Sequence, residues 1–171
     1  YERMQNVGFA YQMIPALKKL YPNKEEASEA LKRHLVIFNT TPAIVTFITG
    51  VAIAMEEKLK KAKEMGEEGD PESVNAVKTA LMGPLAGIGD SFFWGTFRII
   101  GAGIGCSLAA QGSILGAIMF LLIYNIPHLL VRYFGLKIGY RSGMSFLDSM
   151  SEGGIIAALS EVAKVLGLVV V

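Results

Sequence analysis

The sequence predicts an all-α, polytopic membrane protein that has broken or re-entrant helices and begins with amphipathic helices. Of its 171 residues, 52% are hydrophobic and only 18% are charged. The mean hydropathy is +0.44, which is high for a soluble domain. Most of the charges fall in the first 33 residues and in residues 56–72. No alternation typical of a β-strand extends far, whereas apolar residues recur at helical spacing, so helices are expected throughout.

Composition also excludes several classes of function. The net charge of +1 leaves no basic field that would attract nucleic acid. Cys106 is the only cysteine, so disulfides and CxxC metal or redox sites are excluded. His34 and His128 have no second His, Cys or carboxylate at metal-binding spacing, and both are interpreted as structural. We therefore predict no catalytic residue, no metal site and no cofactor.

Residues 1–38 are predicted to form two amphipathic helices. The second begins with Asn23 as its N-cap and Glu26 at the capping-box position. Such helices can lie on a membrane surface or pack on a protein core, and the sequence leaves both alternatives open. The apolar residues of the first helix recur at helical spacing: Met4, Phe9, Met13 and Leu17.

A charge-free stretch from Leu35 to Met55 is long enough for a membrane span but contains the polar sequence Asn39-Thr40-Thr41-Pro42. Thr41 followed by proline resembles an N-cap with proline at the first helical position, so a broken helix is expected. Asn39 and Thr40 are candidates for hydrogen bonding to a substrate, although simple capping is the favoured alternative. Glu56 is expected at a solvated helix end.

Residues 56–72 form a solvated charged segment, and residues 73–171 are predicted to be membrane-embedded helices. Asp70-Pro71 begins the first of these by a cap followed by proline. The final apolar run, from Gly153, reads as the beginning of a further element. Because the chain begins without Met and ends within this run, we expect it to be part of a longer protein.

Between Arg98 and Arg132 lie 33 residues without a formal charge, too few for two full spans. They can form a hairpin that partly enters the bilayer or one long tilted helix. The turn signal Gln111-Gly112-Ser113 favours the hairpin. A positively charged loop is expected after it, on the cytoplasmic side, with three cations and no acid: Arg132, Lys137 and Arg141.

The segment Leu81–Arg98 is the strongest candidate for a functional site. Gly83-Pro84 predicts a helix break, and Asp90 then lies in apolar surroundings with Trp94 shortly after it. A carboxylate at membrane depth is costly and indicates function, and carboxylates and aromatic rings both suit sugars. The alternative is that Asp90 caps the next helix and Trp94 anchors the chain at the membrane interface.

Three small-xxx-small patterns predict close helix packing. They are Gly83xxxGly87, Gly101xxxGly105 and Gly112xxxGly116.

Three long motifs carry a resemblance to a known family. They are YERMQNVGFAYQMIPALKKLY, LKRHLVIFNTTP and LMGPLAGIGDSFFWGT, at residues 1–21, 31–42 and 81–96. Together they resemble the IID membrane subunit of the mannose–fructose–sorbose family of the bacterial phosphotransferase system (PTS). The resemblance covers nearly the whole chain, as one incomplete IID domain over residues 1–171, and the family extends further at both ends.

The resemblance implies a non-phosphorylated, multi-pass subunit of the bacterial cytoplasmic (inner) membrane. It would assemble with a IIC membrane subunit, as a multimer of IIC–IID pairs, and pass a hexose of the mannose, glucose, fructose or sorbose class. IIA and IIB subunits would carry the phosphohistidines, and IIB would phosphorylate the sugar. Family members also serve as receptors for certain bacteriocins.

The residues alone leave the role of this chain in such a complex open. Our interpretation is that Asp90, Trp94, Asn39 and Thr40 contact the sugar. The first alternative is a scaffold that holds IIC and docks IIB without touching sugar. An ion-coupled transporter or channel that works alone is the second, and a soluble enzyme is the least favoured.

Overall fold

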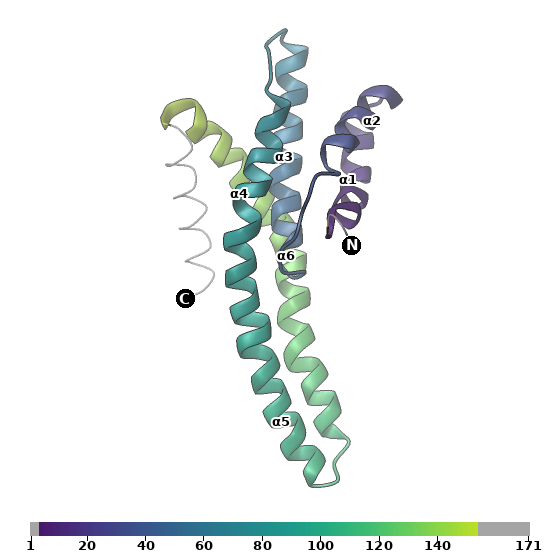
Figure 1. Ribbon diagram of the computed structural model, residues 1–171, viewed down its shortest axis with the longest axis vertical. Coiled ribbons are helices and arrows are strands. Elements are labelled where there is room, and N and C mark those ends of the chain that lie inside the picture. The colour runs from purple at the N-terminus through teal and green to yellow at the C-terminus, as the bar shows by residue number, and fades with distance from the viewer. Residues whose placement is uncertain (1–3, 154–171) are drawn as a thin grey trace.

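The computed structural model describes residues 4–153, with side chains to residue 144, and its regular elements are all helical (Figure 1). The helices α1, α2 and α3 lie in the upper half together with α4 and the later part of α6, and a long helical hairpin extends below them. The final apolar run after Gly153 lies outside the described residues. The elements are α1 (Asn6–Leu20), α2 (Lys24–Arg33), α3 (Val45–Glu64), α4 (Pro71–Asp90), the π-helical segment η1 (Ser91–Phe97), α5 (Arg98–Ala110) and α6 (Leu115–Gly153).

The first two helices pack on the protein itself. Phe9, Met13 and Leu17 are buried on one face of α1 and belong to the same core as α3. Asn23 caps α2 as predicted, because its side chain accepts a hydrogen bond from the backbone N–H of Glu25 at 2.8 Å. Glu26 instead contacts Lys63 near the end of α3. The apolar face of α1 is therefore used by the protein core.

The chain between α2 and α3 is irregular, as the polar sequence in the apolar stretch predicted. The predicted cap was wrong, however, because α3 begins at Val45 and Thr41 does not cap it. The side-chain hydroxyl of Thr41 bonds to α4 instead, at the carbonyl of Ala86 and the carboxylate of Asp90. The polar residues before α3 thus connect two helices.

The elements α4, η1 and α5 follow one another without a break, so Pro71 to Ala110 form one continuous helical column. Asp70 caps it through the N–H of Glu72 at 2.9 Å, with Pro71 at the first position, as predicted. The break expected at Gly83-Pro84 was wrong, since α4 continues through Pro84. The irregularity lies 7 to 13 residues later, in η1, where the wider π-helical winding often marks a functional segment.

A hairpin is present, as the sequence favoured, but its helical columns extend beyond residues 98–132 and each is long enough to cross a membrane completely. It reverses at Gly112, whose φ of +75° favours glycine, and α6 returns antiparallel to α5. Gly105 and Gly116 face each other there, because a Cβ on Gly116 would lie 2.3 Å from the carbonyl oxygen of Gly105. By contrast, Gly83 and Gly87 have no neighbour within 4 Å among the described residues, so that predicted packing pattern is unused here.

The expected basic loop is not a loop. Arg132, Lys137 and Arg141 all lie within α6, which continues to Gly153. In this part of its length α6 packs against α3, and the contact is made at glycines that the sequence analysis did not single out. A Cβ on Gly139 would lie 2.0 Å from the carbonyl oxygen of Phe47, and one on Gly50 would lie 2.3 Å from that of Leu136. Close backbone approach is therefore what joins the hairpin to the upper helices.

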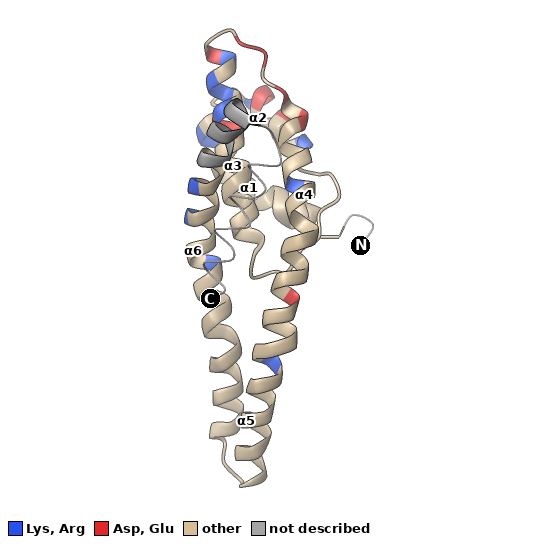
Figure 2. Cartoon of the chain, turned by 90° about the vertical axis from the view of Figure 1, so that its left-hand side faces the viewer, with Lys and Arg blue, Asp and Glu red and all other residues tan. Residues whose placement is uncertain are grey.

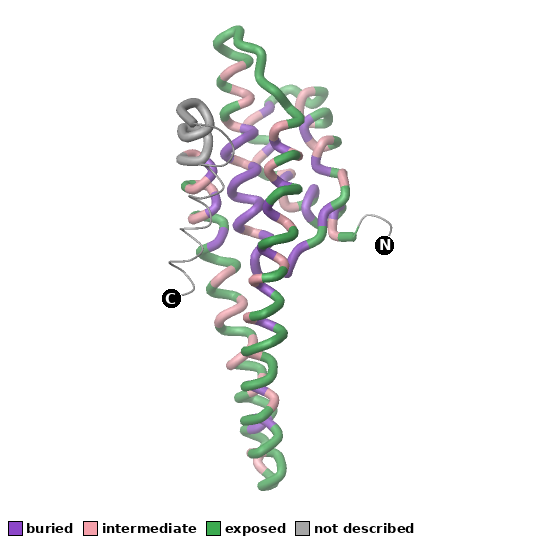
Figure 3. The backbone as a smooth tube through the Cα atoms, turned by 60° about the vertical axis from the view of Figure 1, so that its left-hand side comes forward, coloured by how far each residue is buried: buried purple, intermediate pink, exposed green. Residues whose placement is uncertain are grey.

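Charge and burial divide the molecule along its length. Charged residues gather at the upper end, and few lie along the hairpin (Figure 2). Buried residues follow the same division, with the lower arm mostly exposed or intermediate (Figure 3). The stretches Pro71–Ala110 and Leu115–Met144 are long and apolar enough to cross a membrane, yet only 17% and 6% of their most apolar windows are buried. Core helices of a soluble protein would be mostly buried, so these two require another apolar environment.

Candidate functional site

The segment Leu81–Arg98 meets the start of α3 and the middle of α6. Gly89 is buried against the side chain of Thr41, so closely that a Cβ at Gly89 would lie 2.6 Å from it. This contact positions Asp90, the next residue and the last of α4, beside the loop before α3. The two polar breaks that the sequence analysis identified separately are therefore neighbours in space.

Asp90 and Thr41 form the polar centre of this contact. The Thr41 hydroxyl lies 2.7 Å from Oδ1 of Asp90 and 3.0 Å from the carbonyl oxygen of Ala86. A hydroxyl has one proton, and the charged acceptor at the shorter distance is the stronger partner. Asp90 itself is exposed at the surface of the chain, so one carboxylate oxygen is held while the other can accept a further hydrogen bond. Asp90 caps no helix, since the chain continues as helix on both sides of it.

Trp94 and Arg98 lie one and two turns below Asp90. Trp94 is 48% exposed, and the Arg98 guanidinium lies 4.8 Å from the centre of its ring. Side chains on a helix point toward its N-terminus, so this contact draws the Arg98 charge upward, away from the apolar arm. Asp90, Trp94 and Arg98 are all exposed, and they give the column a polar and aromatic strip.

The loop before α3 is held by Gln5. The Gln5 amide donates to the carbonyl oxygen of Thr40 at 2.9 Å and accepts from its N–H at 3.3 Å. The N–H of Gln5 also donates to the carbonyl oxygen of Phe38 at 2.8 Å. Asn39 is exposed, whereas Thr40 is 3% exposed and its hydroxyl has no hydrogen-bond partner among the described residues. Contact between Thr40 and a ligand would therefore require the loop to open.

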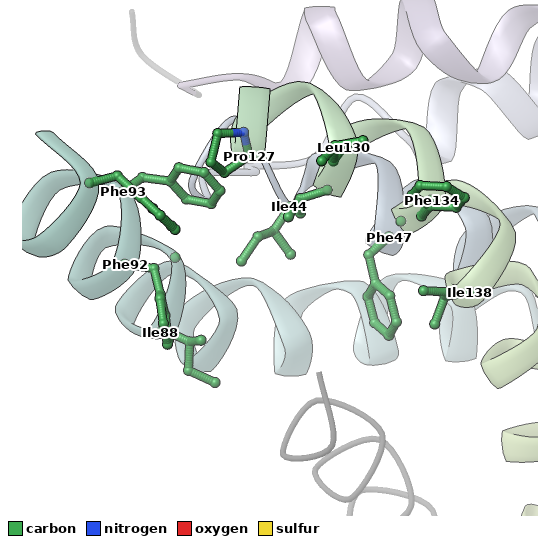
Figure 4. Close-up of a pocket in the computed structure, with 13 residues that line it drawn as sticks. Ile44, Phe47, Ile88, Phe92, Phe93, Pro127, Leu130, Phe134 and Ile138 are labelled. Atoms are coloured by element: carbon green, nitrogen blue, oxygen red, sulfur yellow. The ribbon is translucent and has the colours of Figure 1, made fainter. Parts of the chain in front are cut away.

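A pocket lies beside this strip, between α3, η1 and α6 (Figure 4). It holds about 520 Å³, and every side chain that lines it is apolar. A sugar would find no side-chain hydrogen-bonding group there, so the pocket suits a hydrocarbon chain or the apolar side chain of a partner. Figure 4 shows Ile44, Phe47, Phe92, Phe93 and Leu130 among the residues around it.

The height of the strip follows from helix geometry. Asp90 precedes Ala110, the end of the arm, by 20 residues, or about 30 Å at 1.5 Å per residue. This is roughly the thickness of a bilayer's hydrocarbon core. If the polar turn at Gly112 lies at one membrane surface, Asp90 lies near the other and Trp94 just inside it. That position suits an interfacial tryptophan and places Asp90 at the border of the apolar region.

A second polar cluster, centred on Glu56, was missed from the sequence. Glu56 is fully buried, so the prediction of a solvated helix end was wrong. Its carboxylate accepts from the Tyr21 hydroxyl at 3.0 Å and lies 3.0 Å from Nε2 of His34. Nε of Arg33 lies 2.8 Å away as an ion pair, and α1, α2 and α3 thus meet on one carboxylate.

A buried lysine, Lys78, completes this cluster. Lys78 on α4 is 1% exposed, and its ammonium lies 5.0 Å from the ring centre of Phe9 and 6.0 Å from that of Phe38. No hydrogen-bond partner of this ammonium is present among the described residues. Aromatic faces and the nearby Glu56 charge therefore stabilise a buried cation. Within residues 4–153, no group of three His, Cys, Asp or Glu side chains could hold a metal ion.

The cluster also shifts two protonation equilibria. Burial lowers the pKa of His34 despite the neighbouring Glu56 carboxylate. A neutral His34 with its proton on Nε2 fits the geometry, since it can donate to Glu56 while Nδ1 has no hydrogen-bond partner in the described residues. Burial and then the Glu56 charge raise the pKa of Tyr21 well above its usual range. The sequence signal was weak: Arg33-His34 and Glu56 are 22 or more residues apart, and only folding brings them together.

Known proteins resemble this chain over its entire length. The family model for the PTS system mannose/fructose/sorbose family IID component matches residues 1–171. The sorbose-specific EIID component of Klebsiella pneumoniae is 46% identical over 170 residues, which are 99% of this chain and 60% of that protein. The mannose-specific EIID component of Escherichia coli K12 is 43% identical over 171 residues, 99% of this chain and 59% of that protein.

A solved structure agrees with these relatives. It is a chain from the cryo-electron-microscopy structure of the mannose transporter ManYZ in complex with microcin E492. That chain is 42% identical to this one with a TM-score of 0.82, and the match covers 98% of this chain and 60% of the other. The chain described here thus spans about three fifths of the length of the relatives it matches.

Proposed function

The chain belongs to the mannose/fructose/sorbose family of PTS IID components, and from this we propose that it helps a IIC subunit to carry a hexose across the bacterial inner membrane. Transport would be coupled to phosphorylation of the sugar by a IIB subunit. The observation that carries the proposal is the exposed apolar arm, which needs lipid or a membrane partner around it. The relatives are specific for sorbose or mannose, so the choice among hexoses is left open.

The proposed division of labour places the phosphohistidines on IIA and IIB. His34 supports this, because its imidazole is buried and bonded to Glu56, where a phosphoryl donor could not reach it. This subunit would then act by shaping the path and holding the complex together. Several IIC–IID pairs would form the working unit, with this chain crossing the membrane more than once. The microcin in the solved relative supports a second role as a bacteriocin receptor.

We place the sugar-facing surface at Asp90, Trp94 and Asn39, with Thr40 behind it. The support is geometric. Asp90 is exposed with one oxygen free, Trp94 offers an aromatic face a turn away, and Asn39 is exposed in the loop that Thr41 ties to Asp90. At the calculated height, these groups would lie at the mouth of the path, near the membrane surface, and would receive or release the sugar.

Substitution of Asp90 by Asn tests this role. Asn keeps the shape and can still accept from Thr41, but it loses the charge that strengthens hydrogen bonds from sugar hydroxyls. In the full-length IIC–IID complex, we expect uptake of the transported hexose to fall about tenfold at low sugar concentration. The amount of IIC that co-purifies should be unchanged. Glu67→Gln, at an exposed site in the solvated segment, is the matched control.

The scaffold alternative is favoured by a specific observation, the wholly apolar pocket beside the strip, which suits a partner side chain better than a sugar. It predicts that Asp90→Asn lowers uptake only as far as it lowers co-purification of IIC. Unchanged uptake together with an intact complex would refute the sugar-contact role directly.

A further inference from the structure

A groove on the opposite side of α3 from η1 combines apolar walls with a cation. It lies between the start of α1, the loop before α3 and α6, and its volume is about 320 Å³. Phe9, Phe38 and Pro42 form much of the wall, while Gln12 and Arg132 are the polar groups free to meet a ligand. The side-chain amide of the third polar group, Gln5, is already hydrogen-bonded to the backbone of Thr40.

Arg132 has no acid partner in the part of the chain that the structure describes. It is exposed, and no carboxylate of the described residues lies within ion-pair distance of its guanidinium. The contact that holds this part of α6 is made by its backbone, where the carbonyl oxygen accepts from the Thr46 hydroxyl at 2.8 Å. On its own helix, Tyr133 is the next residue and His128 lies one turn below, and neither side chain is an acid that would neutralise it at neutral pH. With respect to the described residues, the guanidinium is therefore available to an external anion.

The position of Arg132 identifies the kind of anion. It follows Leu115 by 17 residues, or about 26 Å of helix, which is close to the thickness of the hydrocarbon core. No residue between them carries a formal charge, and the helix surface below the groove exposes large apolar side chains. Asp90, on the continuous helix formed by α4, η1 and α5, lies within about 4 Å of the same calculated level. An anion at Arg132 would sit where lipid phosphates sit, directly above a surface suited to acyl chains.

We propose that this groove binds the headgroup of an anionic glycerophospholipid, with Arg132 on the phosphate, Gln12 on the headgroup hydroxyls and the acyl chains along α6. A free phosphate would use the cation but not the apolar helix below it. An apolar peptide segment would use the walls but leave the guanidinium unpaired. The bound lipid would lie against the start of α1, next to Gln5, whose hydrogen bonds hold the loop at residues 38–41.

The test uses the full-length protein with its IIC partner, purified in detergent. The phospholipid retained after delipidation and addition of equal amounts of phosphatidylglycerol and phosphatidylcholine is counted by native mass spectrometry. We expect phosphatidylglycerol to be preferred, and Arg132→Gln to lower its retention about tenfold. Lys137→Gln removes the same charge farther along α6, outside the groove, and should leave retention nearly unchanged.

Other outcomes decide against the site. Equal loss in the Arg132 and Lys137 variants would mean general attraction to a cationic surface, and equal retention of both lipids would remove the role of charge. Displacement of the lipid by millimolar inorganic phosphate would show that the anion, not the lipid, is recognised. If Arg132→Gln fails to assemble, Arg132→Lys keeps the charge and should retain most of the lipid. None of these readouts depends on sugar uptake, so the result is separate from the proposed transport role.

Discussion

Between α1, α2 and α3 the protein buries charge, whereas along α5 and the first half of α6 it exposes large apolar side chains. The upper half surrounds Glu56 with Tyr21, Arg33 and His34. The arm leaves residues such as Ile118, Leu121 and Leu129 about half exposed. Each region would be unfavourable in the surroundings of the other. The upper half makes its own polar environment, and the arm requires an external apolar one.

The difference also concerns how each half is held together. In the upper half, hydrogen bonds and ion pairs join segments 22 or more residues apart, so several helices depend on one carboxylate. In the arm, two helices lie together through Gly101, Gly105 and Gly116, with Phe120 packed across them. We therefore expect substitutions in the upper half to affect the whole fold and those in the arm to affect packing locally.

The largest effect is expected from Glu56→Ala. It leaves Arg33 and Lys78 without their anion, and loss of one partner of a buried charge cluster costs about 3–5 kcal/mol. Thermal unfolding of the purified complex in detergent would show a marked fall in midpoint temperature. Glu67→Ala, an exposed glutamate just beyond α3, serves as the control and should shift the midpoint little. Equal shifts would mean that the buried cluster does not stabilise the upper half.

A second prediction compares the same substitution in both halves. Gly139→Ala places a Cβ 2.0 Å from the Phe47 carbonyl oxygen, and Gly116→Ala places one 2.3 Å from that of Gly105. Both overpack a helix contact, which costs about 1–3 kcal/mol. We expect Gly139→Ala to be the worse, because α6 is held by α3 there, whereas the arm can splay. The unfolding midpoints measure this.

The control for that pair is Gly103→Ala. Gly103 faces open space, and alanine is the better helix former, so the helix should be unchanged or slightly stabilised. If Gly116→Ala proved as harmful as Gly139→Ala, the arm would be as rigid as the upper half, and the contrast between the regions would be wrong.

Gln5 lies at the border of the two regions, and Gln5→Leu should have a smaller effect. It removes both side-chain hydrogen bonds to the Thr40 backbone, which together contribute about 1–2 kcal/mol. Because the same loop carries Thr41, we expect faster amide hydrogen exchange at residues 39–41 with little change in α5. Exchange that rises equally in the arm would contradict a local role for Gln5.

The smallest effect is a pH dependence due to His34. Its pKa is lowered in the folded protein from the usual 6.5, so below that pH the unfolded chain binds a proton that the folded chain resists. The stabilisation by neutral His34 is complete above pH 6.5 and declines as the pH falls toward the lowered pKa. The unfolding midpoint should therefore fall between pH 7 and 5, and less steeply in His34→Gln. Parallel curves would show that His34 is not the group responsible.

Local features of the fold were predictable from the sequence because neighbouring residues determine them. Asn23 and Asp70-Pro71 cap their helices as predicted, and the turn at Gly112 makes the hairpin. The errors have local reasons too. Pro84 did not break α4, since a long helix whose other turns are hydrogen-bonded tolerates one proline. The cations expected in a loop lie in α6. Helix continuity depends on packing that short windows of sequence do not report.

The sequence alone determined the helical class, the apolar arm and the family, and it proposed Leu81–Arg98 as the candidate site. Composition, period and long motifs are properties of the chain itself. The tertiary structure alone decided that Thr41 bonds to Asp90, that Glu56 is buried among α1, α2 and α3, and that Gly139 meets Phe47. These contacts join segments 22 to 92 residues apart, and the energy of a buried charge or a close backbone contact depends on surroundings that exist only after folding.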